Sequence, residues 1–135
     1  MTQPTTYSER LGDIDILQLN TQGFDALTFS QKKLAYHLAQ AGLWGRAISM
    51  DQGSLHTLPL IAVLMELHDQ KGGSLDTQRI IRDTLFVIFA HNGIYHSMSG
   101  ERLDLPLTRR ALAEIEIWNP HAARALRVHW VEAAI

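Results

Sequence analysis

Apolar residues return at helical spacing between residues 30 and 45. They fall on one side of a helical wheel, at Leu34, Ala35, Leu38, Ala41 and Gly42. This spacing predicts an amphipathic helix, and Thr28 or Ser30 can cap its start. Because glycine weakens a helix interior by about 1 kcal/mol relative to alanine, we expect a bend near Gly45 and a polar corner over residues 46–53.

The next apolar run, residues 55–67, predicts a second helix. Pro59 lies near its beginning, where the missing backbone N–H would have no partner inside the helix. We therefore expect this helix to begin at Thr57 or Leu58. A polar loop that contains two adjacent glycines follows over residues 68–74.

A third helix, predicted over residues 78–90, is apolar on nearly every side by its end. Such a helix is expected at the centre of a fold. Ser74 and Asp76 are its candidate N-caps. The Asn92-Gly93 pair that follows favours a left-handed turn or a helix end.

The remaining segments complete an all-α prediction. Residues 1–8 are expected to be a flexible arm, and residues 9–19 a short extended piece laid on the core, because no partner strand is evident. Two more helices are predicted over residues 107–117 and 120–134. The sequence thus predicts one compact all-α domain, residues 1–135, of about five helices with an irregular N-terminal arm.

Composition narrows the classes of function. A length of 135 residues is typical of one domain. The net charge of −2 does not favour binding to nucleic acid or to an anionic membrane. The absence of cysteine excludes disulfides and thiolate chemistry. Neither a signal peptide nor an apolar run of roughly 18 residues occurs. We therefore expect a cytoplasmic protein with no nucleic-acid or membrane partner.

The stretch from Phe89 to Arg102 is the leading candidate for a functional surface. It follows the most apolar helix, yet it carries two histidines, an amide, a phenol and two glycines. A segment that only fills a core rarely holds so many polar groups. The predicted binding residues here are Asn92, Gly93, Tyr95 and His96. We add Asp51 and Gln52, which the predicted corner could place beside them.

The spacing of the histidines and glutamates does not favour a metal site or a catalytic pair of carboxylates. A zinc helix needs two donors about one turn apart, as in H-E-x-x-H, whereas His91 and His96 are separated by five positions with a glycine between them. Glu114 and Glu116 are two apart, so they diverge on a helix and are expected on a solvated face. We predict no catalytic residue and no metal or cofactor site within this chain.

Tryptophans and arginines offer further candidates. The three tryptophans, Trp44, Trp118 and Trp130, are typical of core or interface anchors, with the core favoured. Arg102 with Arg109-Arg110 forms a small basic cluster, which could meet a carboxylate, the end of a substrate or only solvent, with solvent favoured.

Two stretches resemble a known family. Residues 31–48, QKKLAYHLAQAGLWGRAI, followed by Asp51-Gln52, resemble the early helical region of the dipeptidyl peptidase III family. Residues 92–97, NGIYHS, with Arg102 and Pro106 after them, resemble that family's Asn-Gly-x-x-His/Tyr segment and the Lys-Phe-x-Pro-like element that follows it. The resemblance covers residues 7–106.

The resemblance implies a two-lobed zinc enzyme that removes dipeptides from peptide N-termini. Its zinc is held by an H-E-x-x-G-H helix and a further glutamate, which lie beyond the matched region, and this chain has neither. What carries over is scaffold and part of a cleft wall. Asn92, Gly93, Tyr95 and His96 would line that cleft, and Asp51-Gln52 would support it.

Three readings of function follow. The preferred one is a helical domain or fragment of a dipeptidyl peptidase III-like protein that contributes lobe structure or a peptide-binding surface, inactive by itself, with a peptide or the missing catalytic lobe as partner. The alternative is a stand-alone interaction module, a homodimer that buries Trp118 and Trp130. A weaker third reading is an enzyme with an unrelated site on His91, Tyr95 and His96.

Overall fold

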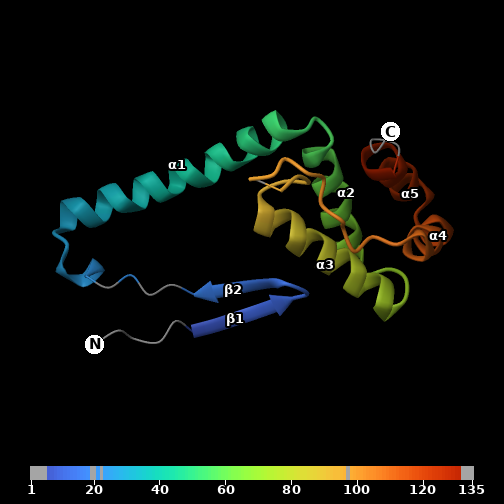
Figure 1. Ribbon diagram of the computed structural model, residues 1–135, viewed down its shortest axis with the longest axis horizontal. Coiled ribbons are helices and arrows are strands. Elements are labelled where there is room, and N and C mark those ends of the chain that lie inside the picture. Colours follow the sequence, from blue (N-terminus) through green and yellow to red (C-terminus); the bar gives the residue numbers. More distant parts are fainter. Residues whose placement is uncertain (1–5, 19–20, 22, 97, 132–135) are drawn as a thin grey trace. The chain divides into compact units, whose positions relative to one another are not determined.

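The computed structural model describes residues 6–18, 21, 23–96 and 98–131, and helices dominate this part of the chain (Figure 1). The elements are β1 (Thr6–Leu11), β2 (Ile14–Gln18), η1 (Phe24–Ala26), α1 (Phe29–Gly53), α2 (Thr57–Gln70), α3 (Leu75–His91), α4 (Arg109–Trp118), α5 (Pro120–Leu126) and the π-helical turn η2 (Arg127–Val131). The all-α class with about five helices is confirmed. Most of the predicted arm, residues 1–8, and the end of the last predicted helix lie outside the described residues.

The chain divides into two compact units, Met1–Arg46 and Ala47–Ile135. The assignment of residues 1–135 to a single domain stays a prediction.

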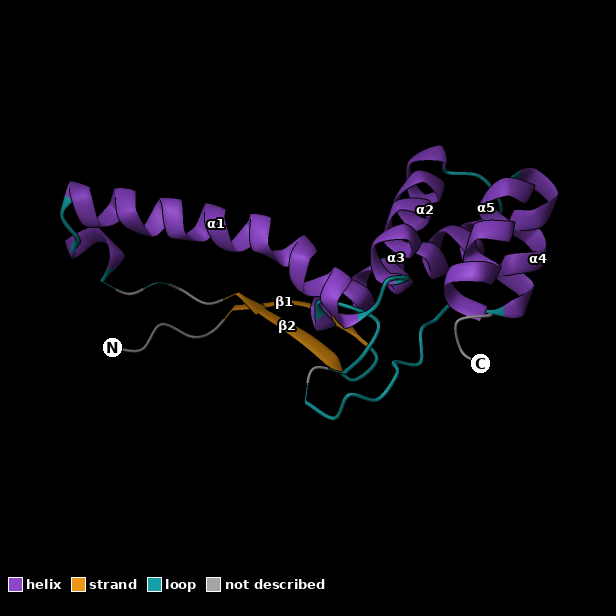
Figure 2. Cartoon of the chain, turned by 90° about the horizontal axis from the view of Figure 1, so that it is seen from above, coloured by secondary structure: helices purple, strands orange, loops and turns teal. Residues whose placement is uncertain are grey.

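The first unit contains a β-hairpin where the sequence predicted an isolated extended piece, and that prediction was wrong. Strands β1 and β2 pair antiparallel, with Leu11 opposite Ile14 (Figure 2). The two-residue loop between them begins at Gly12, whose φ of 58° suits the first position of a tight hairpin turn. The partner strand was overlooked because it begins within the segment assigned to the arm.

Helix α1 begins at a capping box. Thr28 Oγ1 accepts a hydrogen bond from the Gln31 N–H at 3.3 Å, and Gln31 Oε1 accepts one from the Thr28 N–H at 2.8 Å. The predicted corner over residues 46–53 was wrong, because α1 continues without interruption to Gly53, and the bend near Gly45 stays a prediction. A glycine costs only about 1 kcal/mol in a helix, too little to end one when good helix formers follow.

The predicted apolar face of α1 is not covered. Met50 is buried, but the large apolar residues before it are exposed, and Trp44, expected in a core, has 81% of its surface accessible.

The core of the second unit lies among α2, α3, α4 and α5. Helix α2 packs against α3 and α5, and α3 packs against α4. The core side chains that are almost completely buried are Leu60, Leu64, Leu67, Ile81, Ile88, Ile94, Ile115 and Leu126. Each stabilises the fold by roughly 1.5–3 kcal/mol relative to an exposed side chain. Helix α2 begins at Thr57, and α3 is capped by Ser74, both as predicted.

Helix α4 is tied to the start of α3 by Glu114. Its carboxylate accepts hydrogen bonds from the Thr77 hydroxyl at 2.6 Å, from the Ser74 hydroxyl at 2.9 Å and from the Ser74 backbone N–H. These bonds, with that from Thr77 largest, hold the pKa of Glu114 below its ordinary value. Glu114 thus makes specific hydrogen bonds that the sequence did not predict. Glu116 instead pairs with Arg127 at the surface.

The loop between α2 and α3 fits closely around Trp118. A Cβ atom placed on Gly72 would lie 2.5 Å from Cε3 of the Trp118 ring, and Gly73 has a φ of 77°. Both glycines are therefore required, one for space and one for backbone conformation.

We expect Glu114→Gln to destabilise the second unit at neutral pH. Because the carboxyl has a lower pKa when folded, its stabilisation is complete above the ordinary value of 4.5 and is lost as pH falls through the lowered pKa. The variant should therefore have a lower urea midpoint than the wild type at neutral pH. Its midpoint should also fall less than that of the wild type as the pH is lowered. Glu116→Gln is the control, since its exposed ion pair contributes little. Equal pH profiles for wild type and Glu114→Gln would contradict the assignment.

Candidate functional site

The site is organised by the way α3 ends. Asn92 adopts a left-handed conformation with a φ of 56°, as the sequence predicted. The Gly93 N–H donates to Ile88 O at 2.9 Å, and the Asn92 N–H donates to Phe89 O at 3.4 Å. These two bonds form a Schellman motif, which satisfies carbonyls at the helix end and reverses the chain.

The chain then forms a short hairpin, which we call the 94–103 hairpin. Tyr95 pairs with Arg102 in an antiparallel bridge, and the Leu103 N–H donates to Ile94 O at 3.0 Å. The His96 N–H donates to Glu101 O at 2.8 Å nearer the tip. Ile94, with 1% of its surface accessible, anchors the hairpin in the core.

A cavity of about 340 Å³ lies where this segment meets the end of α1 and the start of α2; we call it the loop cavity. Its lining residues are Ser49, Met50, Gly53, Thr57, His91, Asn92, Gly93, Ile94, Tyr95 and His96. A hydrogen bond from Asn92 Nδ2 to Ser49 Oγ, 3.3 Å long, joins the two sides. Segments about forty residues apart in sequence thus form one wall.

Four of the predicted binding residues line the loop cavity, namely Asn92, Gly93, Tyr95 and His96. Asp51 and Gln52 do not line it, and both are exposed. Successive residues of a helix are rotated by about 100° around its axis. Asp51 and Gln52 therefore lie on a different side of α1 from Ser49, Met50 and Gly53.

Sequence reasoning missed Ser49, Gly53 and Thr57 as lining residues. Ser49 and Gly53 are four apart on α1, which is the signal of one helix face, whereas Thr57 is the first residue of α2. That signal was hidden because a corner, not a helix, was expected over residues 46–53.

The polar groups of the loop cavity are hydroxyl, amide and imidazole groups. His96 Nδ1 accepts a hydrogen bond from the Ser99 backbone N–H at 3.2 Å, so a neutral ring carries its proton on Nε2. The His91 ring lies 5.5 Å away, centroid to centroid. No lining residue is an aspartate, glutamate, lysine or arginine. The cavity therefore suits an uncharged polar group such as a peptide bond.

The part of the chain that the structure describes contains no group of three or more histidine, cysteine, aspartate or glutamate residues placed to hold a metal ion. Within the same part, no helix has both the length and the apolar character needed to cross a membrane.

Comparison of the chain with protein families, with curated proteins and with solved structures found no match. The similarity to dipeptidyl peptidase III proteins therefore rests on the two motif stretches in the sequence and stays a prediction.

We expect Asn92→Ala to destabilise the second unit by about 1 kcal/mol more than Asn92→Gly. Both variants remove the side chain and its bond to Ser49, but only alanine is strained in the left-handed conformation at this position. Urea unfolding of the two variants, followed by circular dichroism, measures the difference. Equal stability would show that the backbone conformation at residue 92 does not hold the helix end.

Proposed function

We propose that this chain is a helical portion of a dipeptidyl peptidase III-like protein, and that its loop cavity binds the main chain of a peptide without hydrolysing it. One observation carries the proposal. Residues 92–96, from the second stretch that resembles the family, line one cavity with Ser49, Met50 and Gly53, which directly follow or flank the first stretch although the two segments are distant in sequence. The regions that carry the two motifs thus share a surface, and this supports a common role in binding.

The chemistry of the lining supports a peptide as ligand. A peptide main chain alternates N–H donors and carbonyl acceptors. The cavity offers the Tyr95 hydroxyl, the His96 ring and the Ser49 hydroxyl, which can donate or accept. Its volume of about 340 Å³ admits a short part of a chain.

The proposal assigns no catalysis to this chain. In the family that it resembles, zinc polarises the scissile carbonyl and activates water. The H-E-x-x-G-H sequence that holds this zinc does not occur among the 135 residues. The lining of the loop cavity also lacks a carboxylate that could act as a general base.

Titration of the ¹⁵N-labelled chain with tetra-alanine tests the proposal. We expect backbone amide shifts at Tyr95 and His96, and His96→Ala should weaken binding by about tenfold, as expected for loss of a ring that hydrogen-bonds the peptide. The thermal unfolding midpoint should stay unchanged, because His96 is only partly buried.

Met98→Ala is the matched control, since Met98 lies on the same hairpin but is 91% exposed and does not line the cavity. It should bind tetra-alanine like the wild type. Equal weakening in both variants, or no shift at Tyr95 and His96, would contradict peptide binding. Zinc-dependent release of dipeptides by the purified chain would contradict the absence of catalysis.

The surface of α1 favours a second candidate, an interaction module that pairs with a second copy of this chain. The exposed apolar residues of this helix are Phe29, Leu34, Tyr36, Leu38, Leu43, Trp44 and Ile48. So many on one helix mark an interaction surface. A second copy presents the same helix, so pairing would cover both. Within the chain, Trp118 contacts Gly72 and Trp130 contacts Arg102, and the burial of these tryptophans in a dimer stays a prediction.

Sedimentation velocity over a range of concentrations tests this candidate. Dimerisation should shift to higher concentration, by about tenfold or more, when Leu38 and Trp44 are both replaced by serine, because two exposed apolar anchors are lost. Leu75→Ser, which removes an exposed leucine from α3, is the control and should leave the equilibrium unchanged. A chain that sediments as a monomer at every concentration would rule the candidate out.

A further inference from the structure

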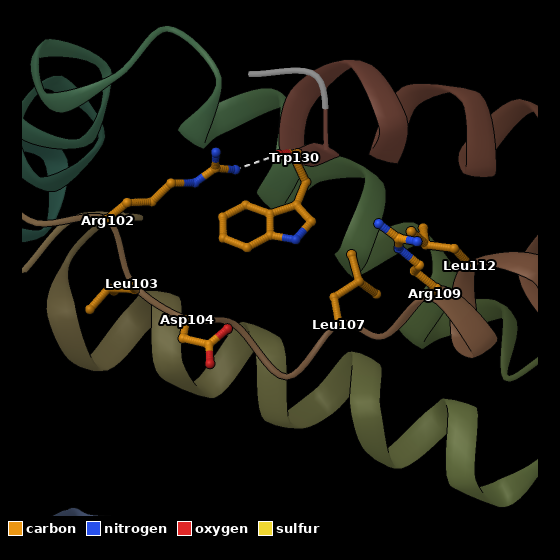
Figure 3. Close-up of a pocket in the computed structure, with 7 residues that line it drawn as sticks. All are labelled: Arg102, Leu103, Asp104, Leu107, Arg109, Leu112 and Trp130. Carbon is orange, nitrogen blue, oxygen red and sulfur yellow. Dashed lines mark hydrogen bonds between the residues drawn. The ribbon is translucent and has the colours of Figure 1, made fainter. Parts of the chain in front are cut away.

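A second hollow is lined by residues from the second strand of the same hairpin. This groove, which we call the Arg102 groove, has a volume of about 450 Å³ and is shown in Figure 3. Its lining residues are Arg102, Leu103, Asp104, Leu107, Arg109, Leu112 and Trp130. Three leucines and an indole form its apolar part, and two arginines and one aspartate form its charged part.

Arg102 is the distinctive group in this groove. Its Nη2 donates to the backbone oxygen of Trp130, and its guanidinium carbon lies 4.0 Å from the centroid of the Trp130 ring (Figure 3). Its Nε and Nη1 atoms are enclosed and have no hydrogen-bond partner in the described structure. Buried donors of a charged group without acceptors are costly, so a ligand that supplies acceptors would remove that cost on binding.

The charges around the groove favour an anion. Arg109, exposed at the start of α4, adds a second cation, and Asp104 is the one acidic residue of the lining. A guanidinium presents parallel N–H donors that match the two oxygens of a carboxylate, a geometry that an ammonium group cannot offer.

Trp130 belongs to η2, and this local geometry supports a functional role. Residues Arg127–Val131 form a π-helical turn. Such turns are rare and occur frequently at functional sites. Because the guanidinium of Arg102 lies against the Trp130 indole, a ligand held by Arg102 would also contact this turn.

From these observations we propose that the Arg102 groove binds the C-terminal carboxylate of a peptide whose last residue is apolar. Arg102 would hold the carboxylate, Arg109 would attract it, and the leucines with Trp130 would contact the terminal side chain. Small-molecule sites enclose about 70–90% of their ligand, whereas this groove is open along one side, which suits the end of a longer chain. The inference does not depend on the proposed function, because it concerns a different hollow.

Nuclear magnetic resonance of the ¹⁵N-labelled 135-residue chain tests the inference. The probes are N-acetyl-leucyl-leucine and its C-terminal amide, which differ in the carboxylate. We expect the acid, and not the amide, to shift the Arg102 Nε–H and Trp130 indole N–H resonances. Binding at the loop cavity would instead register at Tyr95 and His96, so failure of either proposal is recognised separately.

Variants test whether Arg102 recognises the carboxylate. Arg102→Lys keeps the charge but removes the fork of donors, and should weaken binding of the acid by about tenfold or more. Arg110→Gln is the matched control, because this arginine adjoins Arg109 in sequence but does not line the groove; its affinity should stay within about twofold. If Arg102→Lys does not fold, Arg109→Gln should still weaken binding by about threefold through loss of attraction.

Three results would overturn the inference. Equal binding of acid and amide would exclude carboxylate recognition. Equal binding of hexanoate and the peptide acid would make the groove a small-molecule site. If Asp104→Asn alone shifted the Arg102 Nε–H resonance as the peptide acid does, Asp104 would already supply the acceptor that the proposal assigns to a ligand.

Discussion

The left-handed helix end at Asn92 is the constraint on which the rest of the site depends. Without it, the apolar helix α3 would continue away from the core, and Ile94 could not return to its buried position. The Schellman bonds to Ile88 and Phe89 fix the direction of the chain, and the bridge between Tyr95 and Arg102 then fixes its register. The loop cavity and the Arg102 groove are both lined by residues of this short segment.

Features governed by local chemistry could be predicted from the sequence. The start of α2 at Thr57 follows from the proline two positions later, and the Ser74 cap follows from a hydroxyl ahead of an apolar helical run. The turn at Asn92-Gly93 follows from two residues that tolerate positive φ. In each case the residues that decide the structure lie within one helical turn of one another.

Features governed by distant partners could not be predicted in this way. Glu114 binds Ser74 and Thr77, roughly forty positions earlier, and nothing near Glu114 signals this. Asp51 and Gln52 do not line the loop cavity because the corner that could have presented them is part of α1. A penalty of about 1 kcal/mol at Gly45 is too small to decide where a helix ends. The stacking of Arg102 on Trp130 likewise joins residues 28 positions apart.

The two hollows differ in chemistry, and this difference follows from what surrounds each one. The loop cavity is formed between helix ends, where hydroxyl, amide and imidazole groups meet, and none of its described lining residues is an aspartate, glutamate, lysine or arginine. The Arg102 groove is formed where a guanidinium is covered by an indole, which favours a partner that is both anionic and apolar.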